Sequence, residues 1–187
     1  MVRIISGKMG GRRLHSPKSN DLRPTGDRLK ETLFNILGQN LTGLIFVDAF
    51  SGTGAIGIEA LSRGAGAVVF IDRSPESAQL VRRNLELCGV SKGYRLMQLD
   101  IFQCLRQLGR ERFRADIIFL DPPYDYKPYQ DLLGLVFKTG LADSNSVVVI
   151  EHHAKSHLPE SGEGYSRKRI VTQSGHCLSI YAAALNA

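Results

Sequence analysis

Residues 47–57 read VDAFSGTGAIG and decide the fold that we expect for this chain. The segment 44–50 is apolar enough for a buried strand, and 56–63 has the composition of a helix that follows it. Glycines between them match the spacing of the dinucleotide-binding fingerprint, and they are Gly52, Gly54 and Gly57. Such glycines allow a tight turn and a close backbone approach to a ligand at the N-terminus of the helix. The stretch predicts a nucleotide-binding α/β fold, with NAD, FAD or S-adenosylmethionine as the ligand.

Asp48, at the end of the first expected strand, discriminates between these ligands. A carboxylate there would repel a pyrophosphate, whereas it suits the ammonium group of a methionine moiety. We therefore expect S-adenosylmethionine and keep NAD as the alternative. The residues expected to bind the cofactor in this stretch are Asp48, Phe50, Ser51, Gly52, Thr53, Gly54 and Gly57.

Two further strands are expected, 68–72, which ends at Asp72, and 94–99, which Asp100 follows. Asp72 lies about 20 positions past the glycine loop, where nucleotide-binding folds place the ligand of the ribose hydroxyls. Asp100 suits an adenine amino group, which an NAD site does not require. We assign Asp72, Arg73, Asp100 and Ile101 to the cofactor site. The alternative for both acids is a turn or helix cap, and Asp100 could serve both roles.

The apolar run 117–120 is followed by Asp121-Pro122-Pro123-Tyr124. In open α/β sheets, ligands bind at the carboxyl ends of the strands. The prolines remove two backbone donors, which leaves carbonyls to face a ligand, while Asp121 adds an acceptor and Tyr124 an aromatic face. This combination suits a planar heterocycle that carries an amino group, and it resembles the motif of methyltransferases that modify exocyclic amino groups. The alternative is a simple turn after a strand.

The acids Asp48, Asp72, Asp100 and Asp121 each close a hydrophobic run, and helix-length segments separate them. This repeated strand–helix unit predicts an α/β sheet with the acids along one edge. The pattern resembles the Rossmann-like class I methyltransferases. That resemblance implies a seven-stranded, mostly parallel sheet whose last strand is antiparallel. A helix over 128–139, a strand over 146–151 and a hairpin of 167–172 with 177–183 agree with it.

The positive charge is concentrated at the N-terminus, since residues 1–30 carry eight basic and two acidic side chains and so hold a net charge of +6, which equals that of the whole chain. We expect residues 1–40 to form a basic extension, a hairpin followed by a helix capped by Thr25, and residues 41–187 to form the catalytic domain. Such a basic segment is typical of a surface that binds phosphate backbone. The residues expected to contact RNA are Lys8, Arg12, Arg13, Arg23, Thr25 and Arg28. The alternative is an ordinary solvated surface.

Composition excludes several other classes of protein. No stretch is as long and apolar as a membrane span, and the N-terminus lacks an apolar signal region. The cysteines Cys88, Cys104 and Cys177 have no metal-type spacing and fit a reducing cytoplasm. His152, His153 and His157 lack companion ligands, so we expect no metal site.

Further motifs narrow the resemblance to one family. The opening RIISGK and the later LRPT, DRLKETLFN and FSGTG segments are similar to those of the bacterial 16S rRNA guanine-N2 methyltransferases of the RsmD type. The likeness extends over nearly the full chain, with Ser51 where many relatives carry Ala. It implies S-adenosylmethionine as cofactor and a guanine of 16S rRNA, on the small subunit or an assembly intermediate, as substrate. It also implies that Asp121 and the Pro122 carbonyl accept from the guanine amino group while Tyr124 stacks on the base. We expect a cytoplasmic monomer.

Two other classes of function remain as alternatives. One is an amino-group methyltransferase that acts on DNA adenine or protein glutamine, although 187 residues leave no room for the separate recognition domain of DNA enzymes. The other is a non-catalytic RNA-binding module on a methyltransferase fold, which would be expected to have lost Asp48 or Asp121-Pro122-Pro123-Tyr124.

Overall fold

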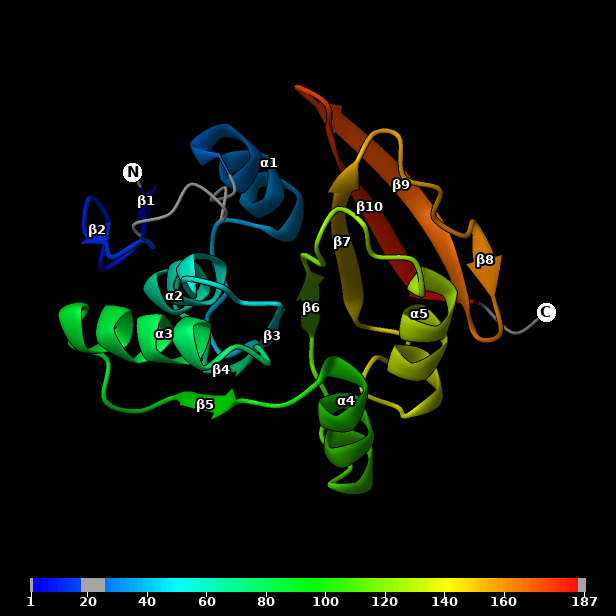
Figure 1. The fold of residues 1–187 in the computed structure, drawn as a ribbon, viewed down its shortest axis with the longest axis horizontal. Coiled ribbons are helices and arrows are strands. Elements are labelled where there is room, and N and C mark those ends of the chain that lie inside the picture. Colours follow the sequence, from blue (N-terminus) through cyan, green and yellow to red (C-terminus); the bar gives the residue numbers. More distant parts are fainter. Residues whose placement is uncertain (1, 18–25, 185–187) are drawn as a thin grey trace.

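The computed structural model describes residues 2–17 and 26–184. This part of the chain forms a two-stranded hairpin and an eight-stranded sheet, and the parallel strands of the sheet alternate with helices along the sequence (Figure 1). The hairpin pairs β1 (Val2–Arg3) with β2 (Arg13–Leu14). The sheet has the order β5-β4-β3-β6-β7-β10-β9-β8. Its strands are β3 (Ile45–Ala49), β4 (Ala67–Ile71), β5 (Tyr94–Met97), β6 (Ile117–Leu120), β7 (Val147–His153), β8 (Ser161–Gly162), β9 (Tyr165–Gln173) and β10 (His176–Ala183). The helices are α1 (Asp27–Leu37), α2 (Ala55–Ser62), α3 (Pro75–Leu87), α4 (Ile101–Arg110) and α5 (Tyr129–Lys138).

The strand directions confirm the expected mostly parallel sheet. Strands β3 to β7 are parallel to one another, and β10 is antiparallel to both of its neighbours, β7 and β9. Among the described residues the structure adds one strand to the expected seven, the two-residue β8 at the edge beside β9. Because the parallel strands run the same way, their carboxyl ends all meet at one edge of the sheet.

Side chains on the central strands alternate between two hydrophobic clusters, one on each face of the sheet. Phe46, Phe70 and Phe119 pack with α1, α2 and α3, whereas Val47 and Leu120 pack with α4 and α5. The two groups of helices therefore cover opposite faces (Figure 1). Within the described ranges, no helix is both long and apolar enough to cross a membrane.

Helix starts agree with the sequence where the structure describes them. Ser74 caps α3, accepting from the Ser77 N–H at 3.3 Å with Pro75 at the first helical position. Asp100 caps α4, accepting from the Phe102 N–H at 2.9 Å. The N-cap of α1 is Gly26, and Thr25, to which we had assigned that role, lies outside the described residues.

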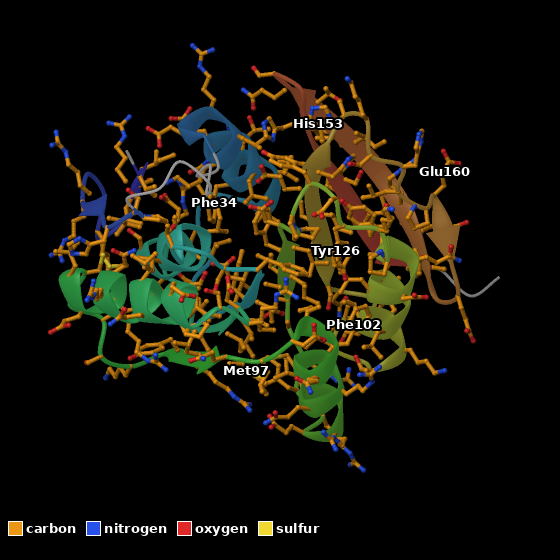
Figure 2. All side chains as sticks on the ribbon, viewed as in Figure 1. Phe34, Met97, Phe102, Tyr126, His153 and Glu160 are labelled. Carbon is orange, nitrogen blue, oxygen red and sulfur yellow. The ribbon has the colours of Figure 1, made fainter. Side chains whose placement is uncertain are left out.

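A buried carboxylate, that of Glu59 on α2, joins the N-terminal residues to the rest of the fold. Glu59 is fully buried and accepts from the backbone N–H groups of Ile5 and Ser6 at 2.7 and 2.9 Å. It also pairs with Arg63 at 2.8 Å and with Lys30 on α1 at 3.7 Å. Arg63 in turn lies 4.4 Å from the centre of the Phe34 ring, which Figure 2 shows in the region between α1 and α2. The extension is therefore held by a charged network inside the protein.

This network shows that one of the bases counted at the N-terminus does not lie on the surface. Lys30, one of the eight bases of residues 1–30, is 1% exposed, and its ammonium group donates to the Arg3 carbonyl. Burial lowers the pKa of Lys30, and the neighbouring Glu59 carboxylate opposes that shift. Lys30 thus contributes to the packing of α1 rather than to a basic surface.

Replacing Glu59 by alanine is expected to destabilise the protein strongly. The substitution leaves Lys30 and Arg63 buried without their counter-charge, which typically costs roughly 3–5 kcal/mol. Denaturant unfolding measures this loss. Glu160→Ala is the matched control, because Glu160 pairs with Arg167 at 3.0 Å while its side chain stays 87% exposed. Equal effects of the two substitutions would contradict the structural role of Glu59.

Candidate functional site

A cavity of about 490 Å³ lies at the carboxyl ends of the parallel strands. Its volume falls in the range that small-molecule sites occupy, roughly 300–1,000 Å³. Most residues assigned to the cofactor from the sequence line it, namely Asp48, Phe50, Ser51, Gly52, Thr53, Asp72, Arg73, Asp100 and Ile101. The residues Asp121, Pro122 and Tyr124 line it as well. One cavity therefore brings together the glycine loop and the segment after β6.

Gly54 and Gly57 do not line the cavity but shape the turn that does. Gly54 is the N-cap of α2 with a left-handed backbone at φ 76°. A Cβ on Gly57 would lie 2.3 Å from the Phe70 ring on β4, so only glycine allows the helix to approach the sheet this closely. These contacts hold the N-terminus of α2 next to the cavity.

Asp48 is 2% exposed and accepts from the Gly57 N–H at 2.8 Å. Burial raises the pKa of its carboxyl to about 8, against the effect of that hydrogen bond, and the charge of Asp72 adds to the shift. A cationic ligand beside Asp48 would favour the ionised form. The geometry is consistent with the ammonium partner that we expected there.

Asp72 and Asp100 each hold backbone groups in place as well as lining the cavity. Asp72 accepts from the Gly52 N–H and the Ser74 N–H, both at 2.9 Å. Asp100 accepts from the Phe102 N–H at 2.9 Å. The alternatives that we had left open are thus real, a turn for Asp72 and a helix cap for Asp100, and they do not remove either acid from the cavity wall. Each carboxylate retains acceptor capacity beyond these bonds.

Several cavity residues were not identified from the sequence. Leu99, next to Asp100, is 43% exposed although it is apolar, and Phe102 lies on the other side of that acid. An exposed apolar side chain beside a cavity suits the face of a planar ring. Their position near Asp100, which we had already assigned to the site, could have identified them from the sequence.

Two buried hydroxyl groups on the cavity wall have no hydrogen-bond partner among the described residues. They are Ser51 Oγ and Tyr126 Oη. The Tyr126 ring packs edge-on against Phe50, with ring centres 5.6 Å apart, and Phe50 itself has a positive φ of 61°. Unpaired buried hydroxyls are costly, and strained residues concentrate at functional sites, so both observations indicate a polar ligand here.

Asp121 follows β6 and lies among other carboxylates. Burial raises the pKa of Asp121 well above its usual range, and the charges of Glu151 and Asp48 add to the shift. The Pro123 carbonyl accepts from the Tyr126 N–H at 2.9 Å and so closes a turn after the motif. Tyr124 is 56% exposed at the rim, with its ring centre 6.2 Å from that of His153 at the end of β7 (Figure 2).

Glu151 is a cavity residue that the sequence reasoning missed. It lies in β7, is 4% exposed, and its Oε1 is 3.4 Å from His176 Nδ1 on β10. It carries the same signal as the four predicted acids, since it follows the apolar run of its own strand. The cavity is therefore lined by five carboxylates, those of Asp48, Asp72, Asp100, Asp121 and Glu151.

Four of the residues assigned to RNA are described in the structure, and none of these four lines the cavity. Lys8, Arg12, Arg13 and Arg28 are exposed, and Arg12 Nη1 donates to the Leu87 carbonyl at 2.8 Å. Arg23 and Thr25, the remaining two, lie outside the described residues. The extension nevertheless reaches the cavity through Val2, Ser16 and Pro17.

Sequence comparison identifies relatives over most of the chain. The family described as Conserved hypothetical protein 95 matches residues 2–182. Ribosomal RNA small subunit methyltransferase D of Escherichia coli K12 is 32% identical over 179 residues, which cover 95% of this chain and 88% of that protein. The protein of the same name from Haemophilus influenzae is 34% identical over 152 residues, 80% of this chain and 78% of that one.

Solved structures agree with the fold. The yhhF structure from Escherichia coli matches with a TM-score of 0.84 at 26% identity and covers 99% of both chains. The structure of SMU.776 complexed with SAH matches with a TM-score of 0.68 at 15% identity, covering 83% of this chain and 48% of that one, and shares the fold. The resemblance found in the sequence is confirmed, and the chain belongs to the family described as Conserved hypothetical protein 95, with small-subunit rRNA methyltransferases D among its relatives.

Proposed function

We propose that this protein transfers a methyl group from S-adenosylmethionine to the exocyclic N2 of a guanine in 16S rRNA. The observation that carries the proposal is the single cavity into which Asp121, Pro122 and Tyr124 face together with the glycine loop and its acids. The relatives named as small-subunit rRNA methyltransferases support the substrate class. We place the reaction in the cytoplasm, with the small subunit or an assembly intermediate as the partner of a monomeric enzyme.

The cavity suits S-adenosylmethionine in charge and in shape. Its five carboxylates favour a ligand that carries both an ammonium and a sulfonium charge. Asp48 would hold the ammonium, Asp72 the ribose hydroxyls, and Asp100 the adenine amino group between Leu99 and Phe102. The unpaired Ser51 and Tyr126 hydroxyls offer further polar contacts. When bound, the cofactor supplies a methyl group that its sulfonium already activates.

Asp121 is the residue that prepares the acceptor nitrogen. The N2 lone pair of guanine is delocalised into the ring and is a weak nucleophile. Acceptance of the two N–H bonds by Asp121 and the Pro122 carbonyl favours a pyramidal nitrogen with its lone pair directed at the methyl group. Asp121 can also receive the proton that N2 loses, since its surroundings raise its pKa and make it a better base than an ordinary carboxylate.

Tyr124 and the N-terminal extension would hold the RNA. An exposed aromatic ring at the rim suits an extruded base, because stacking of a base on an aromatic side chain contributes roughly 1–3 kcal/mol. We propose residues 1–40 as the RNA-binding extension of a catalytic domain over 41–187. Exposed Lys8, Arg12, Arg13 and Arg28 provide its phosphate contacts. Arg23 and Thr25, whose structure is not described, complete the proposed set.

Asp121→Ala is expected to abolish methyl transfer while leaving cofactor affinity intact, because the carboxylate acts on the base. A general base and its positioning contribute roughly 10²–10⁴-fold in rate. Methylation of purified small subunits and calorimetric binding of S-adenosylmethionine measure the two effects. Asp125→Asn, which changes an exposed acid of the same loop, is the control. Near-normal turnover by the Asp121 variant would overturn the mechanism.

Asp72→Asn and Asp100→Asn are each expected to weaken S-adenosylmethionine binding by about 10–100-fold, because hydrogen bonds to a charged group contribute roughly 1.5–3 kcal/mol. Asparagine keeps one acceptor oxygen, which suffices for the Phe102 N–H at position 100, whereas Asp72 accepts through both oxygens and its variant loses one of two backbone hydrogen bonds. Calorimetry reports affinity, and thermal unfolding verifies that each variant folds. Asp143→Asn, at the opposite edge of the sheet, should bind normally. Binding of NAD in place of S-adenosylmethionine would refute the cofactor assignment.

Neutralising basic residues of the N-terminal extension should weaken RNA binding and make it less dependent on salt concentration. For Lys8→Gln, Arg12→Gln and Arg13→Gln combined, each lost phosphate contact should reduce the log–log salt slope by roughly 0.7–0.9. Adding Arg23→Gln should reduce it further. The control replaces Lys92, Arg110 and Arg112, exposed bases at the opposite edge of the sheet, by glutamine. An unchanged salt slope in the variant of the extension would mean that RNA is bound elsewhere.

A further inference from the structure

Glu151 and Asp121 occupy equivalent places on neighbouring parallel strands. Leu120 on β6 pairs with Ile150 on β7, so Asp121 and Glu151 are the next residues in register. Both lie two positions beyond residues, Phe119 and Val149, that pack on the same face of the sheet. Neighbouring strands are about 4.8 Å apart, which places the two carboxylates side by side at the cavity. The contribution of Glu151 to the pKa of Asp121 agrees with this placement.

A guanine in this cavity would present one more donor than the proposed mechanism uses. Its Watson–Crick edge carries the N1–H beside the two N2–H bonds. Asp121 and the Pro122 carbonyl are taken by N2, and N1–H therefore needs a neighbouring acceptor. Glu151 is the carboxylate adjacent to Asp121, and a buried donor left without an acceptor is costly.

We propose that Glu151 is a specificity-determining residue that accepts the N1–H of the target guanine. The inference rests on the proposed function and deepens it by assigning the selection of guanine. Adenine and 2-aminopurine carry a lone pair at N1 in place of a proton. Facing the Glu151 carboxylate, that lone pair would meet a second acceptor, so no hydrogen bond could form between them. Sites that hydrogen-bond a substrate group reject analogues that lack it far more strongly than sites that only exclude by size.

His176 provides an alternative role for Glu151. Its Nδ1 lies 3.4 Å from Glu151 Oε1, and its ring centre lies 6.0 Å from that of Tyr124. If Glu151 served only to hold His176, and through it Tyr124, then removing His176 should reproduce the effect of changing Glu151. A carboxylate can lie beside His176 and accept from a base at once, because it has several lone pairs on two oxygens. The two roles therefore need separate variants.

The test uses 2-aminopurine, which retains the N2 amino group and lacks the N1 proton. The methylated guanine is first mapped in rRNA, and small subunits are then reconstituted with guanine or 2-aminopurine at that position. Methyl transfer to each is measured as kcat/KM for the wild type, Glu151→Gln and His176→Gln. Glutamine preserves the size of the side chain and an acceptor oxygen for His176, while its amide can donate to the N1 lone pair. Thermal unfolding and cofactor affinity establish that the variants are folded.

The wild type should prefer guanine over 2-aminopurine, and Glu151→Gln should lower that preference at least tenfold, in line with the loss of one charge-assisted hydrogen bond, about 10–100-fold. His176→Gln should retain the wild-type preference. An equal loss of both activities in Glu151→Gln, down to no detectable transfer, overturns the inference, as does the same change of preference in His176→Gln. Failure of the wild type to methylate guanine would instead refute the proposed function.

Discussion

The parallel register of β3, β4, β5, β6 and β7 is the constraint on which the site depends. It brings five carboxylates together at one edge of the sheet. Burial disfavours their charge there, and their charges repel each other. Burial is the main cause of the raised pKa values of Asp48, about 8, and of Asp121, and the charges of neighbouring carboxylates add to both shifts. Such a cavity is unfavourable when filled with water and favourable for a cation. A methyl donor that loses its sulfonium charge on transfer would be held more strongly before the reaction than after it.

The sequence predicted the strand–helix order because each strand is apolar and ends at an acid. It missed Glu151 although the expected strand 146–151 ends at that residue, as the other expected strands end at an acid. In the structure the strand continues to His153, which pairs with His176 of the antiparallel strand β10. The position of Glu151 at the cavity depends on its register with Asp121, and register is set by packing between strands that are distant in sequence. The cavity was predictable from local pattern, but its full lining was not.

The charge of the N-terminus shows a second limit of sequence reasoning. Lys30 counts as a surface base in the composition, yet it is buried against Glu59, because the apolar face of α1 brings it inward with Leu29, Leu33 and Phe34. The same network fixes the backbone of Ile5 and Ser6 to α2. Residues of the extension thereby reach the cavity wall, and RNA held by the extension would lie close to the reacting atoms. Nothing in a count of charges distinguishes a buried lysine from an exposed one.

The five carboxylates divide into two groups according to what holds them. Asp48, Asp72 and Asp100 accept from backbone N–H groups of the loops and helices after their strands, so their orientation is fixed before any ligand binds. Asp121 and Glu151 are next in register on the neighbouring strands β6 and β7, and the charge of Glu151, together with that of Asp48, adds to the raised pKa of Asp121. A pair of acceptors at this position is relieved by a ligand edge made only of donors, and guanine is the base whose N1 and N2 groups present such an edge. In the role that we propose for Glu151, the electrostatic cost of placing it beside Asp121 would become selectivity for the base.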